Sequence, residues 1–216
     1  MELPVETSVS RDNFIHSPGN DLACRFLWSW PDWRAQSIVL VGPAGSGKSH
    51  LGAIWKADAK AVEISAGALS DADPAELGRT HVLVDDVTPD AFDPVKLFHL
   101  LNALRQSGRS GLFLSRTHPN AWQVELDDLS SRLRALTVFE LAAPDDDMLR
   151  QVLVKLFSDR QLRVDPSLIA FLVTRMERSV ESANRLVEFL DRETLARNCK
   201  PSRALAAEAL AALGQG

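Results

Sequence analysis

Eight consecutive residues have the types and the spacing of a loop that wraps phosphate groups. They read Gly42-Pro43-Ala44-Gly45-Ser46-Gly47-Lys48-Ser49 and match the pattern G-x-x-x-x-G-K-[ST]. The glycines permit the positive φ values and the close backbone approach that a loop around an anion needs. In such a loop, backbone N–H groups surround the phosphates, Lys48 neutralises the β- and γ-phosphates, and Ser49 ligates Mg²⁺. The sequence therefore predicts a nucleotide-binding loop, the alternative being a glycine-rich turn that only joins a strand to a helix.

Two adjacent carboxylates form a second candidate group. Asp85 and Asp86 directly follow the apolar run of residues 82–84. In a nucleotide site we expect Asp85 to hold Mg²⁺ through water and Asp86 to orient or activate the attacking water. Two acidic residues that merely solvate a strand end would look the same, so this prediction depends on the phosphate loop.

A third group lies at the end of the apolar run of residues 111–115, where Ser115, Arg116 and Thr117 follow one another. Phosphoryl transfer needs further groups that stabilise developing charge. We expect the hydroxyl of Thr117 or of Ser115 to lie beside the γ-phosphate. An ordinary turn at a strand end is the alternative.

The elements that must position these groups alternate between strand and helix as far as residue 142. The expected strands are residues 37–41, 61–65, 81–85, 111–115 and 138–141. The expected helices are residues 21–28, 48–59 and 95–106. Such alternation predicts an α/β fold with a parallel sheet covered by helices. The phosphate loop then lies between a buried strand and a helix N-terminus, where anions bind.

From residue 143 the pattern is purely helical. The expected helices are residues 145–159, 165–177, 179–197 and 202–213. Asp165 followed by Pro166 is a typical helix start. We therefore expect a tail at residues 1–18, a nucleotide-binding α/β domain at 19–142 and a small all-helical lid domain at 143–216.

The composition excludes several classes of protein. Of the 216 residues, 45% are hydrophobic and 25% are charged, as in ordinary globular proteins. No apolar run reaches the roughly 18 to 20 residues of a membrane span, and the N-terminus lacks the features of a secretory signal. Cys24 and Cys199 are far apart, which favours a reducing, cytoplasmic compartment. A net charge of −5 disfavours direct binding to nucleic acid.

Together these residues resemble the AAA+ ATPases, and more narrowly the DnaA branch of bacterial replication proteins. Five segments carry this resemblance: the G-K-S-H-L of residues 47–51, the carboxylates Asp85 and Asp86, the F-H-x-x-N-A-L of residues 98–104, the S-R-L of residues 131–133, and Phe14–Asn20. The last resembles the segment that closes over the adenine. What the resemblance implies is a P-loop AAA+ αβα sandwich followed by a helical lid. Such a protein binds ADP or ATP with Mg²⁺, and His50 then lies beside the nucleotide.

Within that branch, residues 128–133 and 141–147 are most similar to the Hda family, the regulatory inactivators of DnaA. The resemblance implies that the protein, with the sliding clamp of DNA polymerase III, stimulates hydrolysis of ATP bound to DnaA and so prevents a second initiation. Arg132 would act in trans, stabilising transition-state charge at a nucleotide that another subunit holds. The alternative for Arg132 is an ordinary surface ion pair.

Three places depart from the family pattern. Glu181 aligns with the arginine of the family's lid, and Arg178 or Arg185, expected on the same helix face, could replace that arginine. Of the family's clamp-binding peptide, the tail retains only Leu3, Pro4 and Val5. The segment of residues 88–94 is acidic, whereas the initiator carries basic residues there.

Three functions remain open at this point. The first is a nucleotide-regulated protein that acts on a partner ATPase and hydrolyses little ATP itself. The second is an autonomous AAA+ motor or helicase-loader-like protein, which Asp86 and the complete phosphate loop permit. The third, a DNA-binding initiator fragment, is disfavoured by the net charge and by the lack of a C-terminal helix-turn-helix. A homo-oligomer is compatible with each of them.

Overall fold

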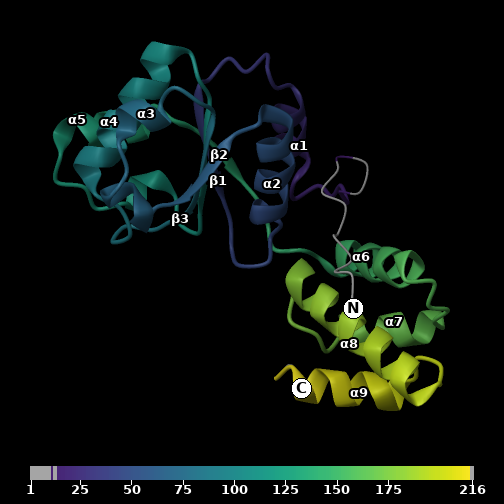
Figure 1. Cartoon of the computed structure of the whole chain (residues 1–216). Helices are drawn as coiled ribbons and strands as arrows, with labels where there is room; N and C mark the ends of the chain where they lie inside the picture. The colour runs from purple at the N-terminus through teal and green to yellow at the C-terminus, as the bar shows by residue number, and fades with distance from the viewer. Residues whose placement is uncertain (1–10, 12–13, 215–216) are drawn as a thin grey trace. The chain divides into compact units, whose positions relative to one another are not determined.

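The computed structural model describes residue 11 and residues 14–214, and its contacts divide the chain into two units (Figure 1). The first, here called the sheet unit, contains residues 18–43 and 48–142 with the described residues up to Phe14. The second, the helical unit, contains residues 15–17, 44–47 and 143–214. Each unit has a hydrophobic core of its own. The tail residues Leu3, Pro4 and Val5 lie outside the described residues.

Five parallel strands form the centre of the sheet unit, in the order β2-β3-β4-β1-β5. They are β1 (Ser37–Val41), β2 (Val62–Ser65), β3 (Val82–Val87), β4 (Gly111–Ser115) and β5 (Thr137–Glu140). The central strands β1, β3 and β4 are rich in apolar residues because both of their faces are covered. The predicted α/β fold with a parallel sheet is confirmed.

Helices cover both faces of this sheet, which makes the unit an αβα sandwich (Figure 1). Ile38 and Leu40 of β1 belong to a core shared with α1 (Asp21–Trp28) and α2 (Lys48–Ala59). Val39 and Val41 belong to the opposite core, shared with α4 (Pro94–Ser107) and α5 (Asp127–Arg134). This division follows from the period of two residues along a strand. Three short elements complete the unit: η2 (Gly67–Ser70), α3 (Pro74–Leu77) and η3 (Pro119–Ala121).

A β-bulge bends the end of β3 at its two carboxylates. Val84 pairs with Phe113 and Val87 pairs with Ser115, so β3 carries one residue more than β4 over this stretch. Asp86 accommodates the bulge with a left-handed φ of 54°. β3 therefore continues to Val87, beyond the predicted end at residue 85. Bulges of this kind change the direction of side chains at the end of a strand.

The helical unit is built from α6 (Asp146–Asp159), α7 (Pro166–Val173), α8 (Val180–Arg197) and α9 (Arg203–Ala212). A side-chain oxygen caps the start of each, from Asp145, Asp165, Ser179 and Ser202. Each such cap stabilises a helix by about 1 kcal/mol. α7 ends at Val173, before the predicted residue 177, and the turn that follows includes a bond from the Ser179 N–H to the Glu177 carbonyl at 2.7 Å. None of the helices in the described residues is long and apolar enough to cross a membrane.

Candidate nucleotide-binding site

The phosphate loop, residues 42–47, connects the end of β1 to the first residue of α2. The Gly42 N–H donates to the Ser115 carbonyl at 3.1 Å, which ties the start of the loop to the end of β4. Gly45 and Gly47 have φ values of 72° and 92°, a region that glycine enters without strain. Because α2 begins at Lys48, its first N–H groups and the positive end of its dipole lie at the end of the loop. This backbone fits an anion.

The Lys48 ammonium is folded onto the loop that it follows. It donates to the carbonyls of Gly42 and Pro43 at 2.7 and 2.8 Å. Burial lowers the pKa of Lys48, the nearby positive charge of Arg116 lowers it further, and the Asp85 carboxylate opposes both effects. Arg116 and Asp85 therefore both lie within electrostatic reach of Lys48.

The remaining residues of the loop differ in exposure. Pro43, Ala44 and Ser49 are exposed, whereas Ser46 is buried. His50, the next residue of α2, is half-buried, and its ring packs edge-on against Phe14 at 5.4 Å between centroids. Burial lowers the pKa of His50. The segment predicted to close over an adenine therefore has its first residue, Phe14, against His50. The roles of both residues toward a nucleotide stay predictions.

The hydroxyl of Ser49 and the carboxylate of Asp85 are oxygen donors of the kind that Mg²⁺ prefers. The residues that the structure describes hold no group of three or more His, Cys, Asp or Glu arranged for a metal ion. In nucleotide sites Mg²⁺ is held by one or two protein oxygens together with the phosphates. Asp85 also accepts the N–H of Asp86 at 2.7 Å, and Asp86 is exposed on the bulge. The metal and water roles of this pair stay predictions.

The two hydroxyls considered after β4 have different surroundings. Ser115 is 1% exposed, and its Oγ lies 2.6 Å from the Val87 carbonyl and 2.8 Å from the Thr117 carbonyl. It also accepts the Thr117 N–H at 3.1 Å. Since a hydroxyl has a single proton, Ser115 serves the backbone at the bulge and is not available to a phosphate. Thr117 is exposed, and of the two it remains the candidate.

Arg132 lies on α5 with its guanidinium over an aromatic ring of α4. Its Cζ is 5.2 Å from the centroid of Phe98, a cation–π contact. Among the described residues, Arg132 takes part in none of the ion pairs. The sequence linked both residues to one family pattern but did not predict that they touch. The alternative role of Arg132, an ordinary surface ion pair, would need a carboxylate partner, and none of the described residues provides one.

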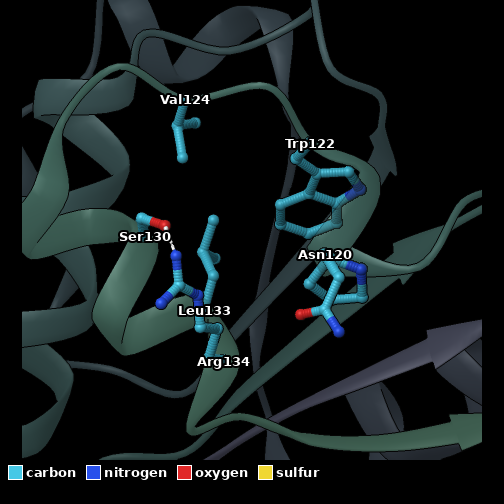
Figure 2. Close-up of a pocket in the computed structure, with 7 residues that line it drawn as sticks. Asn120, Trp122, Val124, Ser130, Leu133 and Arg134 are labelled. Atoms are coloured by element: carbon cyan, nitrogen blue, oxygen red, sulfur yellow. Dashed lines mark hydrogen bonds between the residues drawn. The ribbon is translucent and has the colours of Figure 1, made fainter.

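Arg134, two positions further along α5, has a different setting (Figure 2). Its Nη2 donates to the Ser130 hydroxyl at 3.1 Å. With Trp122, Val124 and Leu133 it lines a small pocket of about 160 Å³. The two arginines therefore share a helix but differ in their contacts, which makes Arg134 a matched control for Arg132.

The structure corrects one expectation about the lid arginines. Arg178 precedes Ser179, the cap of α8, so it does not share a helical face with Glu181. Arg178 pairs with Asp146, and Arg185 lies 3.7 Å from the Glu177 carboxylate and donates to the Ser182 hydroxyl at 3.2 Å. Both arginines are thus engaged within the helical unit. Glu181 itself is exposed.

Comparison by sequence finds a distant relative of this chain but no family model. No family model matches the chain. An uncharacterized protein of Haemophilus influenzae is 27% identical over 195 residues, covering 84% of this chain and 79% of that protein.

Solved structures give a clearer likeness. Domain III of the replication initiation protein DnaA from Thermotoga maritima superposes with a TM-score of 0.79 and 19% identity, over 96% of this chain and 98% of that one. AMPPCP-bound DnaA from Aquifex aeolicus gives a TM-score of 0.70 and 19% identity, over 87% and 68%. The Holliday junction branch migration motor RuvB from Thermotoga maritima gives 0.72 and 14%, over 94% and 72%. This chain therefore has the fold of domain III of DnaA, and RuvB has a similar one.

Proposed function

We propose that this protein is a negative regulator of replication initiation that acts on DnaA. In this proposal it binds ADP or ATP with Mg²⁺ at the phosphate loop and, with the sliding clamp of DNA polymerase III, stimulates hydrolysis of ATP bound to DnaA. Arg132 enters the nucleotide site of DnaA as an arginine finger.

This proposal is supported above all by the contacts that Arg132 makes on the surface of its own chain. An arginine that is to stabilise charge on another subunit must be held in place without being neutralised. The Phe98 ring holds the guanidinium, and no carboxylate of the described residues pairs with it. An arginine supplied in trans raises the rate of phosphoryl transfer by about 10³ to 10⁵.

The chain's own nucleotide site has a supporting part in this proposal. The loop backbone and Lys48 hold the phosphates, while Ser49 and Asp85 hold Mg²⁺, which supplies charge neutralisation. His50 and Phe14 lie at the base end. Bound nucleotide would then fix the conformation in which Arg132 is presented, while hydrolysis by this chain stays slow.

The test compares DnaA turnover under four conditions: with wild type, with Arg132→Ala, with Arg134→Ala and with no addition. DnaA is loaded with ATP, and clamp-loaded DNA is present throughout. We expect Arg132→Ala to lose stimulation and Arg134→Ala to retain it, because Arg134 bonds within its own helix. Equal loss in both variants would show that α5 was disturbed, and equal stimulation by wild type and Arg132→Ala would exclude the arginine-finger mechanism.

An autonomous ATPase or helicase-loader-like motor is the second candidate. Asp86, exposed on the bulge beside a complete phosphate loop, supports it. Under this alternative the protein alone turns over ATP rapidly, and Asp86→Asn abolishes that turnover. Under our proposal the protein alone is slow, and Asp86→Asn leaves the stimulation of DnaA largely intact.

A further inference from the structure

The outer edge of β5 carries backbone groups that the described part of the chain leaves unbonded. Directly after this strand, the Leu141 N–H donates to the Val41 carbonyl at 2.7 Å, on the side of β1. The backbone groups of successive residues in a strand point alternately to its two sides, so those of Val138 and Glu140 point away from β1. No hydrogen bond from another described residue reaches these groups. The outer edge therefore offers two N–H donors and two carbonyl acceptors.

The sequence of β5 does not protect this edge. Edge strands are commonly protected by proline, by lysine or by a bulge. β5 (Thr137–Glu140) contains neither proline nor lysine, and it pairs with β1 in an unbroken register. β2, at the opposite edge of the sheet, differs because its Glu63 forms an ion pair with Lys56 of α2. The edge of β5 is thus open to a further strand.

A row of aromatic rings leads from the core of the sheet unit to the same edge. Trp55 of α2 is 2% exposed and stacks on Trp33 at 5.2 Å between ring centroids. Trp33 packs on Phe26 of α1 at 5.2 Å, and Phe26 packs on Phe139 of β5 at 4.7 Å. The last three rings are half-buried, and Leu22, one turn before Phe26, is 73% exposed. The row therefore ends in apolar surface beside the open edge.

The spacing of the outward backbone groups is self-complementary. If a second β5 lies antiparallel to the first, with a two-fold axis at Phe139, Val138 of each copy faces Glu140 of the other. All the outward donors and acceptors of both strands are then bonded, in four hydrogen bonds. The Ala142 N–H, the next on the outer side, already donates to the Gly19 carbonyl at 3.1 Å, so the pairing is confined to β5.

The same register continues the aromatic row into the second copy. Phe139 of one copy becomes the non-hydrogen-bonded neighbour of Phe139 of the other, the arrangement in which cross-strand side chains approach most closely. Aromatic pairs of this kind stabilise strand pairing. Glu140 of each copy lies opposite the apolar Val138, so like charges do not face each other. A second copy therefore satisfies both the backbone and the side chains of this edge.

We propose that two copies of this chain pair through the outer edges of β5, antiparallel and with the two-fold axis at Phe139, so that their two sheets become one. The paired strands are short and the interface is small, so the dimer dissociates at a concentration on the order of 10 µM. This pairing goes beyond the proposed function because it depends neither on a nucleotide nor on Arg132.

Sedimentation velocity of the full chain, from well below to well above that concentration, tests the pairing. Val138→Pro removes one outward N–H from each copy and leaves the bonds to β1 intact, and proline is tolerated on edge strands. We expect it to raise the dissociation constant of the dimer about 30-fold, because two hydrogen bonds are lost from the pair. Melting curves check that the variant folds.

The matched control is Glu63→Pro on the opposite edge of the sheet. The Val62 N–H donates to the His81 carbonyl, so the backbone groups of Glu63 point away from β3. This substitution therefore also removes one outward N–H from an edge strand. We expect it to leave the dissociation constant of the dimer unchanged.

Disulfide formation tests the register. With the axis at Phe139, two copies of Phe139→Cys bring their Cα atoms to about 4.5 Å, within reach of a disulfide. In the control Thr137→Cys, on the same face of the strand, the two positions lie about 14 Å apart. Both variants carry Cys199→Ser because Cys199 is exposed, whereas Cys24 is buried and burial raises the pKa of its thiol to about 12. We expect mild oxidation to link Phe139→Cys into dimers and to leave Thr137→Cys unlinked.

Three outcomes would overturn the proposal. A wild type that stays monomeric at every concentration leaves the edge to another partner and excludes the pairing. A dimer that Val138→Pro does not weaken, or that Glu63→Pro weakens as strongly, forms through another surface. Equal linking of Phe139→Cys and Thr137→Cys excludes the two-fold axis at Phe139.

Discussion

Replacing Phe98 by leucine tests whether the aromatic ring presents Arg132. Leucine keeps apolar volume on α4 but removes the π face under the guanidinium. The contact, at 5.2 Å between Cζ and the ring centroid, lies near the surface, where cation–π pairs contribute about 0.5 to 1 kcal/mol. That energy corresponds to a change of about two- to fivefold in the ratio of correctly placed to displaced Arg132.

The assay is the rate of ATP hydrolysis by DnaA at a saturating concentration of each variant, with clamp-loaded DNA. Phe98→Leu should lower the stimulated rate by up to about fivefold. In the Arg132→Ala background the same substitution should have no further effect, because the group that the ring holds is gone. The control is Phe171→Leu, which removes a similar pair with Arg175 in the helical unit, at 4.2 Å, and should leave stimulation unchanged.

Two outcomes would refute this reasoning. If Phe98→Leu lowers the rate equally with and without Arg132, the ring contributes to α4 packing or to docking rather than to the arginine. If Phe98→Leu stimulates as well as wild type, the arginine does not need the ring. Melting curves are needed in both cases, since an apolar replacement of this size costs up to about 1.5 kcal/mol of stability.

The remaining predictions concern backbone strain and pH. Asp86 has a φ of 54°, which asparagine tolerates and valine does not, so Asp86→Asn should unfold in urea like wild type while Asp86→Val loses about 1 to 2 kcal/mol. Equal stability of the two variants would contradict the strained bulge. Burial lowers the pKa of His50 and of His81 below 6.5, and the charge of Arg109 adds to the effect at His81. Their contribution to stability is therefore complete above about pH 6.5 and is lost as the pH falls below it. The variant His50→Gln/His81→Asn should lose less stability than wild type between about pH 7 and pH 5.5 in urea titrations, and parallel curves would argue against this linkage.

The strands of the core could be predicted closely from the sequence. Residues 37–41 and 111–115 are continuous apolar runs, because both faces of β1 and β4 are covered, and such runs end sharply at polar residues. The helix starts at Asp165, Ser179 and Ser202 could also be predicted from the sequence. A capping residue can be recognised from its own type and that of the next residue.

Other features depend on contacts between distant residues and could not be predicted. The bulge at Asp86 arises from the pairing of β3 with β4, and nothing local marks it. α5 is short and half of its residues are charged, so its sequence carries little helical signal beyond Leu129 and Leu133, which it buries. Ser179 caps α8, so Arg178, which precedes it, lies outside that helix.

The candidate site likewise has features that could be predicted from the sequence and features that could not. The phosphate loop is a contiguous motif, so its residues and their order could be predicted from the sequence. The influence of the Arg116 charge on the pKa of Lys48, the contact of Arg132 with Phe98 and the use of the Ser115 hydroxyl by the backbone each join separate elements. Only the fold brings these groups together.

We propose that Arg132 acts on a nucleotide held by DnaA. The most direct measurement is single-turnover hydrolysis of ATP prebound to DnaA, with clamp-loaded DNA and either wild type or Arg132→Ala at saturation. The account predicts that Arg132→Ala loses nearly all of the stimulated rate, as removal of an arginine finger costs about 10³-fold or more. Stimulation by Arg132→Ala equal to that by wild type would contradict it.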